Sequence, residues 1–507
     1  MKRSLQRIFF WAGPLSGLLI LFFLDLNPER PETTATLAVA IWMAIWWISE
    51  VVPLAVTALL PVALFPALGV MDGRLVSATY FNHVIFLFIG GFIVALAMQK
   101  WNLHRRIALR ILMLTGTKPA RILLGFMLAT AFLSMWISNT ATTMMMVPIL
   151  ISVISQLDNS TGQLNPQKNP YAIGLLLGVA YSASIGGMVT LVGTPPNLSF
   201  TRIFQIMFPD APEISFADWM VFALPAGLIL FVFAWLFLYL KFGRSSKKQP
   251  LEKNLLKKQY RELGAPSYEE KAILIVFLSL AILWITRAGF EFGSFKIPGW
   301  QDLFRNPEYL NDGTVAIALS IVLFALPSRN DPGKRLIDWN TAKRLPWGIV
   351  LLFGGGFALA SGFKESGLSS WFGEQLSFVS FMHPVFIIAL VALLMTFLTE
   401  LTSNTATTEM ILPVLAGLSV ATKIHPLLFM LPATLSASMA FMLPVATPPN
   451  AIIFGTNKLR VIDMVKTGIV MNIAGTIVIT LSVYFIARWA FGIDLDIFPQ
   501  WAAETNS

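Results

Sequence analysis

The chain has 507 residues, of which 56% are apolar and only 12% are charged, with 36 Lys and Arg against 27 Asp and Glu. About a quarter of the residues are charged in a soluble globular domain, so the composition excludes an ordinary soluble protein and indicates a membrane protein. The absence of cysteine excludes disulfides, thiolate metal sites and cysteine nucleophiles. The formal net charge of +9 does not indicate nucleic-acid binding, because the basic residues lie in short loops between apolar runs.

The first apolar run, residues 8–24, is long enough to cross a hydrocarbon core, which takes roughly 17 to 25 helical residues. Basic residues precede this run, but it continues into Asp25 and a polar loop without a small-residue cleavage site. We therefore expect a retained first span with an outer loop, residues 1–33, and no signal peptide.

Further apolar runs precede a polar, basic stretch at residues 241–271. The predicted spans are 34–49, 51–71, 84–99, 171–192 and 219–240. The basic N-terminus and the basic stretch are both expected in the cytoplasm, which requires an even number of crossings between them. With the first run the number is six, and residues 34–240 form a first structural unit joined to the next by a cytoplasmic linker.

The second half of the chain repeats this organisation in residues 272–490. Its predicted spans are 272–286, 313–328, 345–363, 427–446 and 467–487. An odd number of crossings places the C-terminal tail, residues 491–507, outside the cell, in agreement with its acidic residues. The prediction is therefore an all-α polytopic protein with eleven crossings, in a bacterial inner membrane.

An internal duplication relates the two units. The six residues Ser-Asn-Thr-Ala-Thr-Thr at 138–143 recur unchanged at 403–408, which is 265 positions later. Segment 100–121 contains six Lys and Arg and no acid, whereas its equivalent, 365–386, contains two Glu and no Lys or Arg. Opposite loop charge predicts that the two copies face opposite sides of the membrane, as the inverted repeats of alternating-access transporters do.

Each copy of the duplicated sequence lies in an apolar segment too short for two crossings. Residues 122–150 number only 29, and two arms of about fourteen residues reach only about 21 Å each. We therefore expect re-entrant hairpins at 122–150 and 384–415 that turn near the bilayer midplane, where a helix break must line protein or a watery cavity. The residues at the two tips are Ser138, Asn139 and Thr140, and Ser403, Asn404 and Thr405.

A second duplicated motif, Gly/Ala-Thr-Pro-Pro-Asn, occurs at 193–197 and 446–450. Consecutive prolines break a helix and free carbonyl oxygens upstream. Together with hydroxyl and amide oxygens, these carbonyls suit a hard cation such as sodium, while amide donors and half-helix N-termini suit carboxylates. Neither tip nor either Pro-Pro motif contains Lys or Arg, so an entering anion must be balanced by bound cations, which couples the two ligands.

At these paired motifs the chain resembles the divalent anion/sodium symporter family, which includes bacterial sodium/dicarboxylate cotransporters, and the resemblance spans nearly the whole length. The resemblance implies a homodimer in which a transport part moves like an elevator against a scaffold. The sodium ligands that it implies are Ser134, Ser138, Asn139 and the Gly193 carbonyl at one site, and Thr399, Thr402, Asn404 and the Ala446 carbonyl at the other. The substrate ligands that it implies are Ser138, Asn139, Thr140 and Thr194 with Ser403, Asn404, Thr405 and Thr447.

The leading functional hypothesis is a sodium-coupled importer of C4 dicarboxylates such as succinate, malate or fumarate, with no organic cofactor. A sodium-independent dicarboxylate exchanger is the alternative, followed by a citrate or sulfate carrier. An intramembrane enzyme is disfavoured because the chain has neither a His-Glu-x-x-His motif nor a cysteine. A ligand-sensing receptor would show binding without flux.

Two acidic residues flank the second tip. Glu400 and Glu409 lie at expected membrane depth, where an ionisable group is a functional candidate. Glu409 stands where the first repeat has Met144 and so breaks the internal symmetry. It either tunes proton or cation sensitivity, or it pairs within the protein or extends to the outer face. Two further asymmetries, the long loop 288–312 and the insertion 158–170, have no predicted function.

Overall fold

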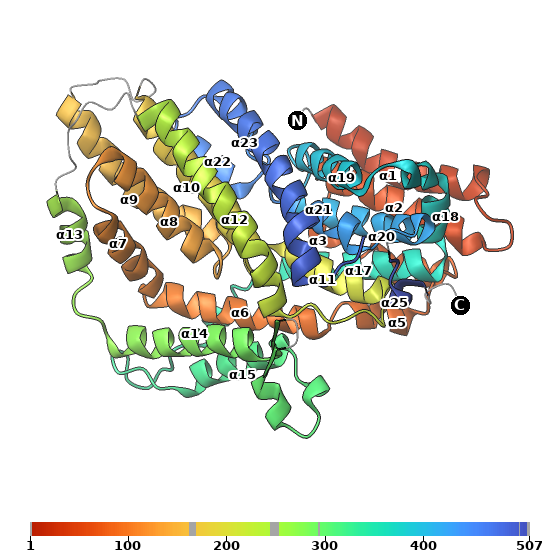
Figure 1. The fold of residues 1–507 in the computed structure, drawn as a ribbon, viewed down its shortest axis with the longest axis horizontal. Coiled ribbons are helices and arrows are strands. Elements are labelled where there is room, and N and C mark those ends of the chain that lie inside the picture. Colours follow the sequence, from red (N-terminus) through yellow and green to blue (C-terminus); the bar gives the residue numbers. More distant parts are fainter. Residues whose placement is uncertain (1–2, 162–168, 244–252, 293–294, 496, 504–507) are drawn as a thin grey trace.

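The computed structural model describes residues 3–161, 169–243, 253–292, 295–495 and 497–503. Most of this part of the chain is helical (Figure 1), and its only strands, β1 (Gly289–Phe292) and β2 (Phe295–Pro298), form one antiparallel hairpin. The predicted all-α class is therefore confirmed. Residues 162–168 of the predicted insertion and 244–252 of the predicted linker lie outside the described residues.

The first half of the chain forms helices of very unequal length. They are α1 (Arg3–Phe23), α2 (Pro31–Ser49), α3 (Leu54–Thr57), α4 (Leu60–Ala67), α5 (Gly73–Thr79), α6 (His83–Lys100), α7 (Leu103–Thr115), α8 (Pro119–Ser134), α9 (Asn139–Thr161), α10 (Pro170–Met188), α11 (Pro195–Met207), α12 (Phe216–Leu238) and the π-helical extension η2 (Tyr239–Gly243).

The second half begins with the linker helix and ends with a short helix near the C-terminus. Its elements are α13 (Lys253–Glu262), α14 (Tyr268–Thr286), η3 (Trp300–Leu303), η4 (Pro307–Tyr309), α15 (Asp312–Ala325), α16 (Trp339–Ala342), α17 (Trp347–Glu365), α18 (Leu368–Gln375), η5 (Ser377–Phe381), α19 (Pro384–Leu398), α20 (Asn404–Thr422), α21 (Leu427–Ser436), α22 (Pro448–Phe454), α23 (Val461–Ser482), η6 (Val483–Ala487), α24 (Arg488–Ala490) and α25 (Gln500–Ala503).

Seven of the described helical stretches are long and apolar enough to cross a membrane. They are Leu5–Phe23, Gly73–Lys100, Pro170–Met188, Phe216–Gly243, Trp347–Glu365, Asn404–Thr422 and Val461–Ala490. Six of them coincide with predicted spans, and the seventh belongs to the second predicted hairpin. These helices confirm a polytopic membrane fold, while the count of eleven crossings stays a prediction.

Two predicted spans are not continuous helices. In span 427–446 the helix ends at Ser436, so that prediction was wrong. The other is span 51–71. Residues 51–71 were expected to form a single helix, but they fold as α3 and α4, which have only 4 and 8 residues. Pro61 occupies the first turn of α4, where its missing N–H is tolerated, so a new helix begins there. The expectation of one continuous span was wrong because the apolar composition concealed this proline break.

The two predicted hairpins turn where expected but have unequal arms. The first arms, α8 and α19, contain 16 and 15 residues, whereas the second arms, α9 and α20, contain 23 and 19. The predicted ends at residues 150 and 415 were wrong, as was the estimate of equal arms. The polar residues 158–161, which belong to the predicted insertion, continue the helix of α9 as far as Thr161.

The two repeats exchange helix partners. Gly90 of α6 lies against the backbone of Ala316 in α15, and the equivalent Gly355 of α17 lies against Ala58 at the end of α3. A Cβ at either glycine would overlap its neighbour, so glycine permits both close approaches. In the same reciprocal manner α9 packs against α22, and α20 packs against α11. Each hairpin is therefore held by the half-helix that follows the other repeat's Pro-Pro motif.

The ion pairs between distant segments fall into two groups. Lys100 pairs with Asp338 at 2.7 Å and Arg106 with Glu270 at 2.8 Å, and all four residues belong to segments predicted to face the cytoplasm. Hydrogen bonding to Lys100 lowers the pKa of Asp338 to about 2. Arg287 pairs with Glu213 at 2.9 Å, between segments predicted to lie outside. The described pairs thus join only loops assigned to the same side, although the orientation in the membrane stays a prediction.

Candidate functional site

The first tip gathers three of the predicted sodium ligands around one glycine. Ser134, at the end of α8, donates its hydroxyl hydrogen to Oδ1 of Asn139 at 2.5 Å, and Asn139 is the first residue of α9. Gly187 of α10 lies so close to this Oδ1 atom that a Cβ would overlap it, and Gly193 lies against the carbonyl of Gly187. Ser134, Asn139 and Gly193 are therefore brought together where α10 ends.

The second tip repeats this geometry with a threonine in place of the serine. The Thr399 hydroxyl lies 2.5 Å from Oδ1 of Asn404 and 2.8 Å from the carbonyl oxygen of Ala437. The hydroxyl and amide oxygens are five residues apart in both copies, and in both the asparagine begins the second arm. The two tips thus present equivalent pairs of oxygen atoms beside the end of a broken helix.

The last asparagine of each Pro-Pro motif has a structural role that was not predicted from the sequence. Nδ2 of Asn197 donates to the carbonyl oxygens of Gly187 at 3.4 Å and Thr190 at 2.7 Å. Nδ2 of Asn450 donates to those of Ala440 and Leu443, both at 3.0 Å. Each asparagine therefore satisfies carbonyls ten and seven residues upstream, which the helix break leaves without helical partners. The asparagine is the last residue of the duplicated motif, so the signal was present in the sequence.

Thr402 is not joined to the other predicted sodium ligands of its site. Its hydroxyl donates to the carbonyl of Leu398 at 2.8 Å and lies 2.6 Å from the hydroxyl of Thr407, both in its own hairpin. With Ser403, it lines a cavity of about 30 Å³ against Trp47 at the end of α2. No contact between Thr402 and Asn404 is described, so its assignment as a sodium ligand stays a prediction.

The remaining predicted residues lie at helix starts. The Ser138 hydroxyl accepts a hydrogen bond from the backbone N–H of Ala141 at 3.3 Å, and the Thr447 hydroxyl accepts from that of Asn450 at 3.3 Å. The others are the buried Thr194, Thr405 and Ala446 and the half-buried Thr140 and Ser403.

The two tips are not directly joined. Among the described residues no hydrogen bond connects segment 138–140 with segment 403–405, and in Figure 1 the α8–α9 and α19–α20 hairpins lie on different sides of α12 and α23. The repeats are connected nearby by Tyr181 of α10, which donates its hydroxyl hydrogen to the carbonyl of Phe441 at 3.1 Å. Both tips are expected near the bilayer midplane, but no direct contact between them is described.

Four helices begin at the four motifs. The N-termini of α9 and α20 lie at the two tips, and those of α11 and α22 lie at the two Pro-Pro motifs. Helix N-termini carry partial positive charge and unpaired N–H groups, which favour anions. Oxygen ligands for a cation and helix starts for an anion therefore occur in the same segments, without Lys or Arg in any of the four motifs.

Glu400 is buried and pairs within the protein. Its carboxylate accepts hydrogen bonds from the consecutive backbone N–H groups of Phe441, Met442 and Leu443 at 2.7, 2.8 and 3.0 Å, and from Nδ2 of Asn472 at 2.8 Å. These groups lie at the break between α21 and α22 and on α23. Glu400 thus satisfies donors that the break in the second repeat leaves exposed.

Glu409 is fully buried and has a single hydrogen bond. Its Oε1 atom accepts from the Ser199 hydroxyl of α11 at 3.0 Å, whereas Oε2 has no partner among the described residues. The possibility that this side chain extends to the outer face is excluded. The role of Glu409 is considered separately below.

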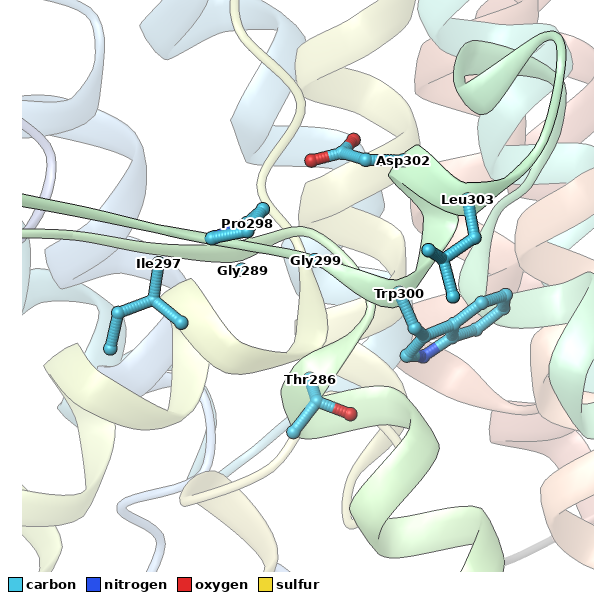
Figure 2. Close-up of a pocket in the computed structure, with 8 residues that line it drawn as sticks. All are labelled: Thr286, Gly289, Ile297, Pro298, Gly299, Trp300, Asp302 and Leu303. Carbon is cyan, nitrogen blue, oxygen red and sulfur yellow. The ribbon is translucent and has the colours of Figure 1, made fainter.

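A cavity of about 400 Å³ lies away from the motifs (Figure 2), between the end of α14 and the β1–β2 hairpin. Its lining is mostly apolar, with Ile297, Trp300 and Leu303, and its only charged residue is Asp302. None of the predicted site residues contributes to it. We therefore place the candidate site at the hairpin tips and not in this cavity.

A comparison with known families identifies the chain at this point. Residues 17–492 match the family described as the sodium:sulfate symporter transmembrane region. The chain belongs to this family. The resemblance predicted from the paired motifs is thereby confirmed.

Similar proteins within the family are named sodium-dependent dicarboxylate transporter SdcS. The protein from Staphylococcus saprophyticus is 44% identical over 516 residues, which cover 98% of this chain and 97% of that protein. The protein from Staphylococcus aureus strain bovine RF122 is 44% identical over 490 residues, covering 96% and 92% of the two chains.

Two solved structures share the fold at low identity. The Alcanivorax borkumensis YdaH transporter gives a TM-score of 0.54 at 13% identity, covering 82% of this chain and 86% of that chain. Neisseria gonorrhoeae MtrF, described as an antimetabolite efflux pump, gives a TM-score of 0.53 at 11% identity, covering 97% and 95%. At these identities the likeness concerns the fold alone.

Proposed function

We propose that this chain is a sodium-coupled symporter of C4 dicarboxylates such as succinate, malate and fumarate, and not an enzyme. The observation that carries the proposal is the pair of equivalent oxygen clusters, Ser134 with Asn139 and Thr399 with Asn404, each beside a broken helix. The 44% identity to proteins named sodium-dependent dicarboxylate transporter supports the choice of ion and substrate.

Sodium binds at the two clusters in this proposal. At the first, Ser134, Ser138, Asn139 and the Gly193 carbonyl supply neutral oxygen atoms, as a weakly charged hard cation requires. At the second cluster the oxygen atoms come from Thr399, Asn404 and the Ala446 carbonyl. Thr402 joins them once its hydroxyl no longer donates to the carbonyl of Leu398. The short Ser134–Asn139 and Thr399–Asn404 contacts hold the amide oxygens in place before the ion arrives, which reduces the ordering that binding requires.

The dicarboxylate bridges the two tips. One carboxylate meets the start of α9 with Ser138, Asn139 and Thr140, and the other meets the start of α20 with Ser403, Asn404 and Thr405. Thr194 and Thr447 contribute from the Pro-Pro motifs. Because these segments contain no Lys or Arg, the bound sodium ions neutralise the anion, and each ligand lowers the electrostatic cost of binding the other.

An elevator movement is supported by a difference between the repeats. Helix α7 packs against α8, the first arm of its hairpin, whereas its equivalent α18 packs against α20, the second arm. Two arrangements of the same unit in one molecule are what two alternating states of an inverted-repeat transporter require. We include in the proposal a homodimer in a bacterial inner membrane, with the N-terminus in the cytoplasm and the C-terminus outside.

The test is uptake of labelled succinate into proteoliposomes with and without an inward sodium gradient. Sodium-driven accumulation is the expected result. Uptake that needs internal dicarboxylate and no sodium would establish an exchanger instead. Preference for citrate or sulfate would correct the substrate, and binding without flux would indicate a receptor.

A further inference from the structure

Glu409 lies where the second hairpin meets helices of both repeats. It follows Asn404 by five residues on α20, and its side chain is 0% exposed. Its Oε1 atom accepts the hydroxyl hydrogen of Ser199 on α11 at 3.0 Å, and Oε2 is buried without a partner among the described residues. The carboxyl group thus has one hydrogen bond where an ionised, buried carboxylate requires several.

A glycine on α17 makes room for this carboxyl group. A Cβ at Gly356 would overlap both Cδ and Oε2 of Glu409. The first repeat has no such arrangement, because the equivalent Gly91 has Val192 Cγ1 at 3.5 Å from a Cβ position and the equivalent Met144 is 61% exposed. In the second repeat, the space beside Gly356 therefore holds a carboxyl group. The first repeat has no equivalent of this arrangement.

The charged groups on the surrounding helices do not pair with Glu409 in the described part of the chain. On α11, Arg202 lies one turn beyond Ser199. On α17, Lys364 donates to the carbonyl of Ile206, and Glu365 is the last residue of the helix. Tyr80, which lies against Gly354, donates its hydroxyl hydrogen to the carbonyl of Ala58. Helix α18 contributes only the acidic Glu374, α21 contributes no titratable group, and α2 contributes Glu32 in its first turn and Glu50 at its C-cap.

These surroundings leave a proton as the ligand that fits. A lone ionised carboxylate at this depth is costly without a cation or several donors. One hydroxyl and one carboxyl group are too few oxygen ligands for a metal ion such as sodium. We propose that Glu409 is a proton-binding site, occupied in the arrangement described here, that makes the contact between α20 and α17 depend on pH.

This inference deepens the proposed function, and its predicted effect of pH on transport rests on that function. If the hairpin moves relative to α17 during transport, Glu409 leaves the Gly356 position and gains water, so its ionised form becomes less costly. Protons therefore favour the arrangement with α20 against α17, and alkaline pH favours the other arrangement. Acidic conditions are expected to slow the departure from the arrangement described here.

Infrared spectroscopy of the purified protein tests the proton site without any substrate. The wild type is expected to show the carbonyl stretch of a protonated carboxyl group at neutral pH, and E409Q is expected to lose it. The matched control is E400Q, because Glu400 accepts four hydrogen bonds from N–H groups and should be ionised. A spectrum in which E409Q removes no protonated carboxyl signal overturns the inference.

Uptake measurements in proteoliposomes test the consequence. E409Q mimics the neutral acid and keeps a group that can accept from Ser199, so it should fold and should lose the dependence of the uptake rate on pH that Glu409 causes. E409M, which restores the first-repeat residue, should lose it as well. Unchanged pH dependence in both variants contradicts the coupling. If the infrared signal behaves as expected but no dicarboxylate is transported by the wild type, the proposed function fails and the proton site stands.

Discussion

The two repeats of this chain share their polar motifs and differ in what surrounds them. Asn197 and Asn450 cap carbonyls at the same upstream offsets, and Asn139 and Asn404 have the same kind of hydroxyl partner. The residues equivalent to Glu400 and Glu409, however, are Met135 and Met144 in the first repeat. The hairpins also meet different neighbours, since α7 packs on α8 and α18 packs on α20.

This difference separates the motifs at the two tips, which are alike in both repeats, from the residues behind the tips, which are not. A ligand that bridges two tips needs the same oxygen atoms and helix starts on each side. The surface behind each tip has no such requirement, because the two hairpins face different helices. We therefore expect matched substitutions in the motifs to have equal effects, and matched substitutions behind the motifs to have unequal effects.

The largest expected effect concerns the paired asparagines. Asn139→Ala and Asn404→Ala should each reduce sodium-driven succinate uptake to background, because each removes an amide oxygen and a helix-start residue from one tip. Ser134→Ala and Thr399→Ala keep the amide but remove the group that positions it, so the apparent sodium affinity should fall roughly 10- to 100-fold. Sodium titrations of uptake measure both effects. Full uptake by either asparagine variant, in folded protein, would mean that the two-tip site is misplaced.

The next effect concerns Arg287, which anchors the long loop between α14 and α15 in the second repeat. Its Nε atom donates to Asp312 at 2.6 Å and its Nη2 atom to Glu213 at 2.9 Å. Arg287→Ala leaves the buried Asp312 without its cation and should destabilise the protein by about 3–5 kcal/mol. Glu213→Gln should change stability by less than about 1 kcal/mol, because Glu213 is 47% exposed. Denaturation in detergent micelles compares the two variants, and equal losses would contradict this ranking.

A smaller effect is expected at Glu400. Glu400→Ala removes the acceptor of three backbone N–H groups and of Asn472, so a loss of about 3 kcal/mol is expected if water does not replace it. Met135→Ala, at the equivalent position, should cost less because no hydrogen-bond acceptor is lost from its side chain. The same denaturation measurement tests the pair. A larger loss for Met135→Ala would show that Glu400 does not support the break between α21 and α22.

The smallest effect separates two equivalent glycines. Gly356→Ala should destabilise by about 1–3 kcal/mol, because its methyl group would overlap Glu409. Gly91→Ala should be neutral, or stabilising by up to about 1 kcal/mol, since its nearest neighbours are Val192 Cγ1 at 3.5 Å and Trp284 at 3.6 Å and alanine favours a helix. A double variant, Gly356→Ala with Glu409→Ala, should recover part of the loss. Additive losses would show that Glu409 does not occupy the space beside Gly356.

Local features of this protein could be predicted from its sequence because they depend on neighbouring residues. Prolines 195 and 448 start new helices, the Ser-Asn-Thr sequences mark the two hairpin turns, and the apolar composition indicates a membrane protein. Each of these features follows from backbone donors, acceptors and φ angles within a few residues. The duplicated spacing added the expectation of two equivalent tips, whose oxygen pairs the structure shows at 2.5 Å in both repeats.

The exchange of helix partners between the two repeats was decided only by the tertiary structure. So were the opposite environments of two glutamates on one hairpin, Glu400 with four donors and Glu409 with one. These contacts join residues that are far apart in the sequence, 41 to 72 positions for Glu400 and 210 for Glu409. An apolar run has nearly the same composition whichever helix it meets. The sequence by itself determined where the chain turns and which polar atoms stand at the turns. The packing of whole helices decided which of those atoms are buried and which of them have hydrogen-bond partners.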